Sequence, residues 1–173
     1  MSTAISPLAS PFPDMPQIAG VTPRVARAQY KPWDRCDLTF ISFDAGTTVA
    51  GVTTQSKCPS PEVEWCRAHL AAGVARGLVV SAGNANAFTG HKGRAAVEAV
   101  TAKAAAHLGC APSDVFASAT GVIGVPLPID KAEAGLDAAF TAAPCSWADV
   151  AAAISTTDTF PKWATATAGD VTV

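Results

Sequence analysis

Apolar and polar residues alternate with a period of two in several stretches of the chain, which is the pattern of half-buried β-strands. The alternation over 37–44 continues through Ala45-Gly46 into 47–54, so we expect a β-hairpin there. Two continuously apolar runs, 77–81 and 115–119, are typical of strands that are buried on both faces. The pattern therefore predicts a hairpin together with separately connected, buried strands.

Apolar residues at helical spacing lie between these strands. We expect a helix to begin at Ser60-Pro61-Glu62, where a serine cap, a proline and an acidic residue come together, and to carry an apolar stripe as far as Val74. Further helices are predicted at 94–108, 131–142 and 146–154. The tail 163–173 alternates around Gly169-Asp170, which predicts a second hairpin.

The order of these elements is β-β-α-β-α-β-α-α-β-β, which mixes hairpins with βαβ-like units. The predicted fold class is therefore α+β, with mixed α/β layers in which helices pack on sheets. Residues 1–17 are rich in Ser and Pro and predict a loose N-terminal arm. We expect residues 18–173 to form a single domain.

Composition narrows the classes of function. Only 15% of the 173 residues are charged, against roughly 25% in an average domain, so we expect much of the surface to be buried, either within the domain or against a partner. A net charge of −2 gives no electrostatic case for binding nucleic acid or an anionic membrane, and no apolar run is long enough to span a bilayer. The five cysteines are scattered and form no CxxC pair, which favours reduced thiols in the cytoplasm.

The segment GNANAFTG (83–90) follows a predicted buried strand and contains the only two asparagines of the chain, Asn84 and Asn86. Asn and Gly tolerate left-handed backbone, and Asn side chains bond to nearby amides, so we expect these two residues to support the loop. Such a loop either binds a ligand or only connects a strand to a helix. It is not a Walker phosphate loop, because His91 stands where that motif needs a lysine.

Two further segments carry groups that can stabilise charge. Thr120-Gly121 follows a predicted strand, and a sharp turn at the glycine could aim an amide and a hydroxyl at one oxyanion, although a plain tight turn is the commoner use of such a glycine. The segment STTDTFPK (155–162) carries hydroxyls that either bind a polar ligand or cap a helix end. The sequence has no metal-binding spacing of Cys and His and no GxSxG, so we expect no metal and find no nucleophile paired with a base.

Three segments in this order, GNANAFTG, ATGVIGVPLP (119–128) and AAISTTDTFPK (152–162), resemble the α-chain of the bifunctional ornithine acetyltransferase/N-acetylglutamate synthase family. The resemblance extends from about Ile18 to the C-terminus. It implies the DmpA/ArgJ-like fold, completed by a β-chain that is cut from the same precursor. In this family the new N-terminal threonine of the β-chain is the nucleophile. An acetyl group passes from N-acetylornithine to that threonine and then to glutamate, in arginine biosynthesis.

For this chain, the resemblance implies that Thr120 and Gly121 form the oxyanion hole and that Thr157 contacts substrate. It also implies a cytoplasmic α2β2 heterotetramer without a cofactor, and it leaves open whether acetyl-CoA is a second acetyl donor. The family's lysine-bearing KGxGM segment and its Ala-Thr cleavage site are expected beyond Val173. Two alternatives remain: an aminopeptidase of the same fold that also uses an N-terminal nucleophile, and a non-catalytic structural subunit.

Overall fold

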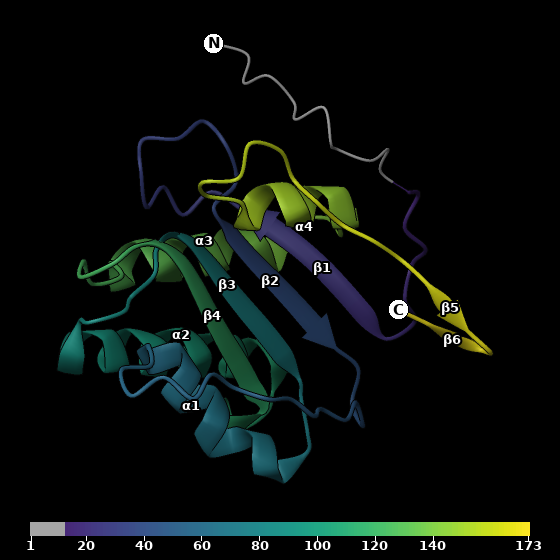
Figure 1. The fold of residues 1–173 in the computed structure, drawn as a ribbon, viewed down its shortest axis with the longest axis horizontal. Helices are drawn as coiled ribbons and strands as arrows, with labels where there is room; N and C mark the ends of the chain where they lie inside the picture. The colour runs from purple at the N-terminus through teal and green to yellow at the C-terminus, as the bar shows by residue number, and fades with distance from the viewer. Residues whose placement is uncertain (1–12) are drawn as a thin grey trace.

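A four-stranded sheet in the order β1-β2-β3-β4 is the centre of the computed structural model, which describes residues 13–173 (Figure 1). The strands are β1 (Val21–Ala26), β2 (Leu38–Phe43), β3 (Gly77–Asn84) and β4 (Val115–Val122). Strand β2 pairs antiparallel with both β1 and β3, whereas β3 and β4 are parallel. Residues 1–12 of the predicted N-terminal arm lie outside the described residues.

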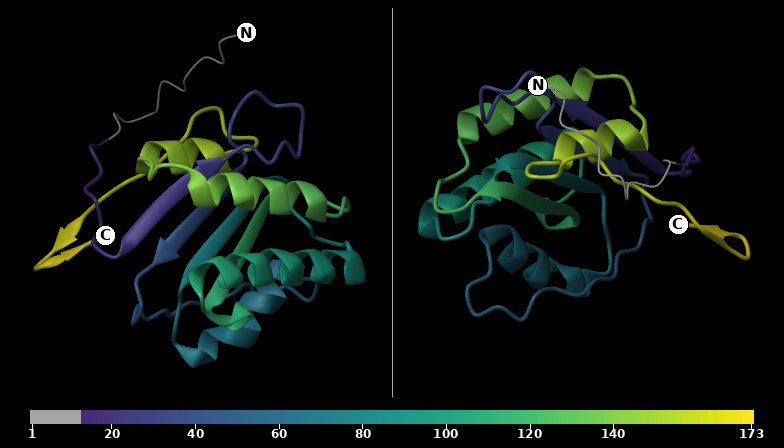
Figure 2. Two further views of the ribbon diagram at one scale, coloured as in Figure 1. Left: turned by 180° about the vertical axis from the view of Figure 1, so that it is seen from behind. Right: turned by 45° about the horizontal axis from the view of Figure 1, so that its top comes forward.

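Helices cover both faces of this sheet. Helices α2 (Gly90–Leu108) and α3 (Ile129–Thr141) lie side by side across one face, as Figure 2 shows. Helix α4 (Trp147–Ile154) packs against β1, β2 and β3 on the opposite face of the sheet. It lines a pocket together with Val80 and Ser118, whose side chains point away from α2 and α3. Confirming the predicted α+β class, the molecule thus has a helix–sheet–helix arrangement.

Helix α1 (Pro61–His69) lies along the free edge of β4. There the Trp65 Nε1–H donates to the Val115 carbonyl at 2.9 Å, and Cys66 Sγ lies 3.2 Å from the Ala117 carbonyl oxygen. Short 3-10 turns follow α1 and precede β4, at Leu70–Ala72 and Pro112–Asp114. The tail forms the predicted second hairpin from β5 (Thr167–Ala168) and β6 (Val171–Thr172).

The main hydrophobic core lies between the sheet and the helices α2 and α3. Leu38, Phe40 and Leu136 are completely buried there. The Phe40 and Phe140 rings pack edge to face with their centroids 5.1 Å apart. Such a pair stabilises the folded state by about 0.5–1.5 kcal/mol beyond the burial of its apolar area. Alanines and glycines let α3 come close to the sheet: a Cβ on Gly135 would lie 2.6 Å from the Ala28 Cβ.

The predicted hairpin over 37–54 is wrong. Residues 47–54 form no strand, and only an isolated bridge joins Thr48 to Val74. Strand β2 pairs instead with β3 and with β1, and the sequence pattern did not reveal β1 because Pro23 interrupts it. Proline is tolerated because β1 is an edge strand: the Pro23 carbonyl accepts from the Cys145 N–H at 2.9 Å, on the side away from β2.

The remaining predicted elements are present with shifted bounds. The two buried strands continue three residues further than predicted, to Asn84 and Val122, and α2 begins at Gly90, four residues earlier. The first predicted helix ends at His69 rather than near Val74. None of the helices in residues 13–173 is long and apolar enough to cross a membrane.

Candidate active site

The candidate site residues gather at one edge of the sheet. Strands β1, β3 and β4 run in the same direction, so the segments that follow them meet at their carboxyl ends. This is the edge at which α/β sheets commonly bind ligands. Two backbone hydrogen bonds join the loop after β3 to the end of β4 and the bend that follows it. The Ala85 N–H donates to the Val122 carbonyl and the Gly124 N–H donates to the Ala87 carbonyl, both at 2.8 Å.

Gly83 and Gly121 face each other at this edge in a contact that only glycine permits. They are paired in the β3–β4 register, with φ values of 137° and 125°. A Cβ on Gly121 would lie 2.4 Å from the Gly83 carbonyl carbon. The expected sharp turn at Gly121 is wrong, because Thr120 and Gly121 still belong to β4 and the chain bends only at 123–125. The positive φ nevertheless sets the Gly121 peptide apart from an ordinary strand peptide.

Thr120 lines a pocket of about 300 Å³ between β4 and the segment that follows α4. Its Oγ1 lies 3.4 Å from the Thr156 Oγ1. The pocket is lined by Val80, Ser118, Thr120, Ala151, Ile154, Ser155, Asp158 and Lys162. The structure therefore brings Thr120 together with the hydroxyl-rich segment 155–162, as a shared polar site requires.

Thr157 lies next to this pocket rather than in its wall. Its side chain is exposed, while the adjacent Asp158 lines the pocket. The Thr157 hydroxyl has no hydrogen-bond partner among residues 13–173, and the C-terminal cap of α4 is Ser155 rather than Thr157. Thr157 is thus free to contact a ligand that enters the pocket from outside.

Asp158 and Lys162, which both line the pocket, form an ion pair. The Lys162 ammonium bonds to the Asp158 carboxylate, which lowers the pKa of that carboxyl. Within the described residues, no His or Cys lines this pocket, and no cluster of His, Cys, Asp and Glu could hold a metal ion. The pocket offers hydroxyls and one charge pair, which can bind and stabilise a polar group, but no conventional nucleophile with its base.

Asn84 and Asn86 are both buried, and each donates hydrogen bonds to backbone carbonyls of neighbouring segments. The Asn84 Nδ2 donates to the carbonyls of Val125 and Pro126 at 3.2 and 3.1 Å, which fixes the segment after β4. The Asn84 Oδ1 is buried and has no hydrogen-bond partner among the described residues.

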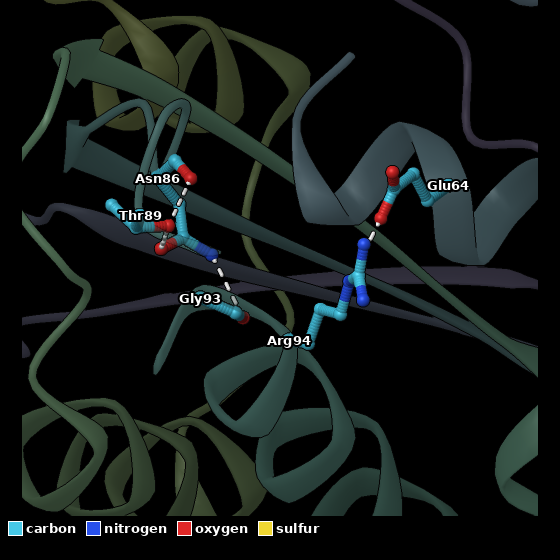
Figure 3. Close-up of polar contacts among 5 residues, drawn as sticks. All are labelled: Glu64, Asn86, Thr89, Gly93 and Arg94. Atoms are coloured by element: carbon cyan, nitrogen blue, oxygen red, sulfur yellow. Dashed lines mark hydrogen bonds and ion pairs between the residues drawn. The ribbon is translucent and has the colours of Figure 1, made fainter. Parts of the chain in front are cut away.

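Asn86, at φ 53°, bonds to Thr89 and to Gly93 of α2, as Figure 3 shows. Its Nδ2 donates to Gly93 O at 3.1 Å and to Glu62 Oε1 at 2.7 Å, and its Oδ1 accepts from the Thr89 hydroxyl at 3.0 Å. The nearby Glu64–Arg94 ion pair also ties α1 to α2.

Glu62 is a buried acid whose environment the sequence did not reveal. It was expected only as an acidic residue at the positive end of α1, yet it is 4% exposed and contacts Asn86. Burial raises the pKa of the Glu62 carboxyl, and its Oε2 has no partner among the described residues. The signal was hidden because Asn86 lies 24 residues away in the sequence.

Comparison with known proteins identifies the family of this chain. A model of the ArgJ family matches residues 23–173. The chain is 59% identical over 163 residues to the arginine biosynthesis bifunctional protein ArgJ of Zymomonas mobilis, and 54% identical over 170 residues to that of Bradyrhizobium diazoefficiens. These alignments cover 94% and 96% of this chain but 40% and 41% of the relatives. The chain thus spans about two fifths of the length of the curated relatives it matches.

Two solved structures are similar as well. The ornithine acetyltransferase of Mycobacterium tuberculosis, complexed with ornithine, has a TM-score of 0.77 at 30% identity, over 81% of this chain and 77% of that chain. The arginine biosynthesis bifunctional protein of Bacillus halodurans has a TM-score of 0.73 at 26% identity, over 81% of this chain and 74% of that chain.

Proposed function

Since the chain belongs to the ArgJ family, we propose that it is the α-chain of an acetyltransferase that moves an acetyl group from N-acetylornithine to glutamate in arginine biosynthesis. The observation that carries the proposal is the family match over 23–173, which includes the Thr120-Gly121 pair and the pocket beside it. The pocket's lack of a nucleophile with a base agrees with a nucleophile supplied by another chain.

In the proposed reaction, the N-terminal threonine of a β-chain attacks the acetyl carbonyl of N-acetylornithine, and its own α-amine takes up the hydroxyl proton. The carbonyl oxygen becomes an oxyanion, which accepts hydrogen bonds from the Thr120 hydroxyl and the Gly121 N–H. The amide C–N bond then breaks, the ornithine amine leaves with the proton, and the acetyl group remains as an ester on the threonine. The amine of glutamate attacks this ester through a second oxyanion at the same donors. Each such donor is worth about 3–4 kcal/mol in the transition state.

Thr157 has the role of a substrate contact in this proposal. Its exposed hydroxyl follows Thr156, which lies 3.4 Å from Thr120, and precedes Asp158 at the pocket. A ligand held between β4 and the segment after α4 would meet this hydroxyl. The contact would be made in both the ground and transition states, so it acts mainly on substrate affinity.

The remaining parts of the proposal concern the assembly. Residues 18–173 form a single α-chain domain, and the β-chain comes from the same precursor in a cytoplasmic α2β2 heterotetramer. The low charge of this chain supports a partner that covers part of its surface. No cofactor is needed, and acetyl-CoA is a candidate second donor of the acetyl group.

The test uses the full-length protein, expressed so that both chains assemble. It is given N-acetylornithine with and without glutamate, and the formation of ornithine and N-acetylglutamate is followed. We expect both products in equal amounts when glutamate is present. Cleavage of peptide amides without acetyl transfer would instead identify an aminopeptidase, and an assembled protein that performs neither reaction would favour a structural subunit.

A further inference from the structure

Arg35 reaches across the fold from the loop between β1 and β2 to the C-terminal end of α4. Its Nη1 donates to the carbonyls of Ala152 and Ala153 at 2.9 and 3.2 Å, and its Nη2 donates to the Ser155 carbonyl at 2.5 Å. The last carbonyls of a helix have no partner within the helix, so a guanidinium with several N–H donors can satisfy them together.

Among the described residues, the other side chain that bonds to a carbonyl at the end of α4 is Ser155, whose hydroxyl donates to the Ala151 carbonyl at 2.7 Å. As the C-terminal cap of α4, Ser155 has an extended backbone at φ −65° and ψ 141°, rather than the left-handed glycine that usually closes a helix. The last turn of α4 also lacks a basic residue. Arg35 therefore supplies, from 117 to 120 residues away, the positive charge that the negative end of a helix favours.

The loop holds Arg35 in a fixed place. The guanidinium carbon lies 4.2 Å from the centre of the Trp33 ring, in a cation–π contact. The buried Asp37 carboxylate accepts backbone N–H groups from Ala28, Gln29 and Tyr30, at 2.7, 3.2 and 2.7 Å. The Arg35 backbone is thus held near the sheet and its guanidinium is held by Trp33, so Arg35 fixes the position of the end of α4 relative to the sheet.

The segment that Arg35 holds forms one wall of the candidate active site. Ser155, whose carbonyl Arg35 bonds, lines the pocket, and the next residue, Thr156, places its hydroxyl 3.4 Å from that of Thr120. We propose that Arg35 is a positioning residue, which fixes the end of α4 so that Ser155, Thr156 and Thr157 stand opposite Thr120. The kinetic part of this inference rests on the proposed function.

The test compares Arg35→Ala and Arg35→Lys with Arg27→Ala in the full-length, assembled protein. Arg27 is a matched control, because it lies in the same loop and, within residues 13–173, its side chain pairs only with the exposed Asp34, at 2.7 Å. We expect Arg35→Ala to raise the KM for N-acetylornithine about tenfold with a smaller change in kcat, because displacement of a binding wall weakens substrate binding first. Arg35→Lys should lie in between, since it keeps the charge but loses the fork of donors.

Hydrogen exchange supplies a readout that does not depend on activity. The amides of 155–158 should exchange faster in Arg35→Ala than in Arg27→Ala, while those of α2 stay unchanged. A KM and an exchange pattern equal to those of Arg27→Ala would overturn the inference, and so would a lower melting temperature with unchanged KM. If Arg35→Ala does not fold, Arg35→Lys decides by the same measurements. If the unmodified protein transfers no acetyl group, the proposed function fails, and the exchange at 155–158 alone decides the role of Arg35.

Discussion

The close approach of Gly83 and Gly121 predicts a specific cost for a single methyl group. In Gly121→Ala the new Cβ would lie 2.4 and 2.5 Å from the Gly83 carbonyl carbon and oxygen, which are backbone atoms that cannot rotate away. Relieving this overlap costs about 1–3 kcal/mol, as overpacked cores do. The φ of 125° adds about 1–3 kcal/mol for a residue with a side chain.

Gly124→Ala separates these two contributions. Gly124 also has a positive φ, 80°, but a Cβ there would meet nothing within 4 Å, so only the backbone cost applies. The two variants should therefore differ by about 2 kcal/mol in the free energy of unfolding. In the assembled protein, the melting temperature should fall in the order unmodified, Gly124→Ala, Gly121→Ala, with a few degrees between the variants. The kcat for acetyl transfer should fall most in Gly121→Ala, because the displaced peptide carries the proposed oxyanion donor. Equal melting temperatures for the two variants would refute the close approach of β3 and β4.

Three further substitutions test other parts of the account. Thr157→Val should raise the KM about fivefold, the equivalent of one neutral hydrogen bond, with kcat and melting temperature nearly unchanged; an unchanged KM would exclude the substrate contact. Asn86→Ala should destabilise the protein by about 3 kcal/mol, measured by denaturant unfolding, because the buried Glu62 and the Gly93 carbonyl lose their donor; a loss below 1 kcal/mol would contradict that role. Burial raises the pKa of Glu62 above its ordinary 4.5, so the folded state binds the carboxyl proton more tightly than the unfolded state does. The stability that the protonated carboxyl contributes below pH 4.5 is therefore lost as the pH rises toward the folded pKa. The melting temperature of Glu62→Gln, minus that of the unmodified protein, should accordingly increase between pH 4 and pH 7, and a pH-independent difference would contradict the raised pKa.

Local sequence signals were sufficient where an element is specified by its own residues. The continuous apolar runs beginning at Gly77 and Val115 are strands, although β4 is buried only over 115–117. Gly109, at φ 63°, ends α2 as a glycine cap does. The prediction of a hairpin over 37–54 failed because Ala45-Gly46 has the composition of a hairpin turn, while β1, which does pair with β2, contains Pro23, a residue that argues against a strand.

The candidate site could be predicted only in part, because its organisation depends on contacts between residues far apart in the sequence. Thr120 and Gly121 were predicted as site residues from their place after a predicted strand and from the family resemblance; the structure puts them within β4, and their role stays a prediction. The contacts that organise them join residues far apart in the sequence: Thr120 to Thr156, Arg35 to α4, and Glu62 to Asn86. No periodic pattern encodes such pairs, because each depends on how whole elements pack.

The central claim is that Thr120, together with the Gly121 amide, stabilises the oxyanion of acetyl transfer. The most direct test is the single-turnover rate at which N-acetylornithine acetylates the assembled protein, measured with Thr120→Ala and with the unmodified protein. The account predicts that the rate falls about 100-fold in Thr120→Ala, while substrate affinity and melting temperature stay close to those of the unmodified protein. An unchanged acetylation rate in Thr120→Ala would contradict it.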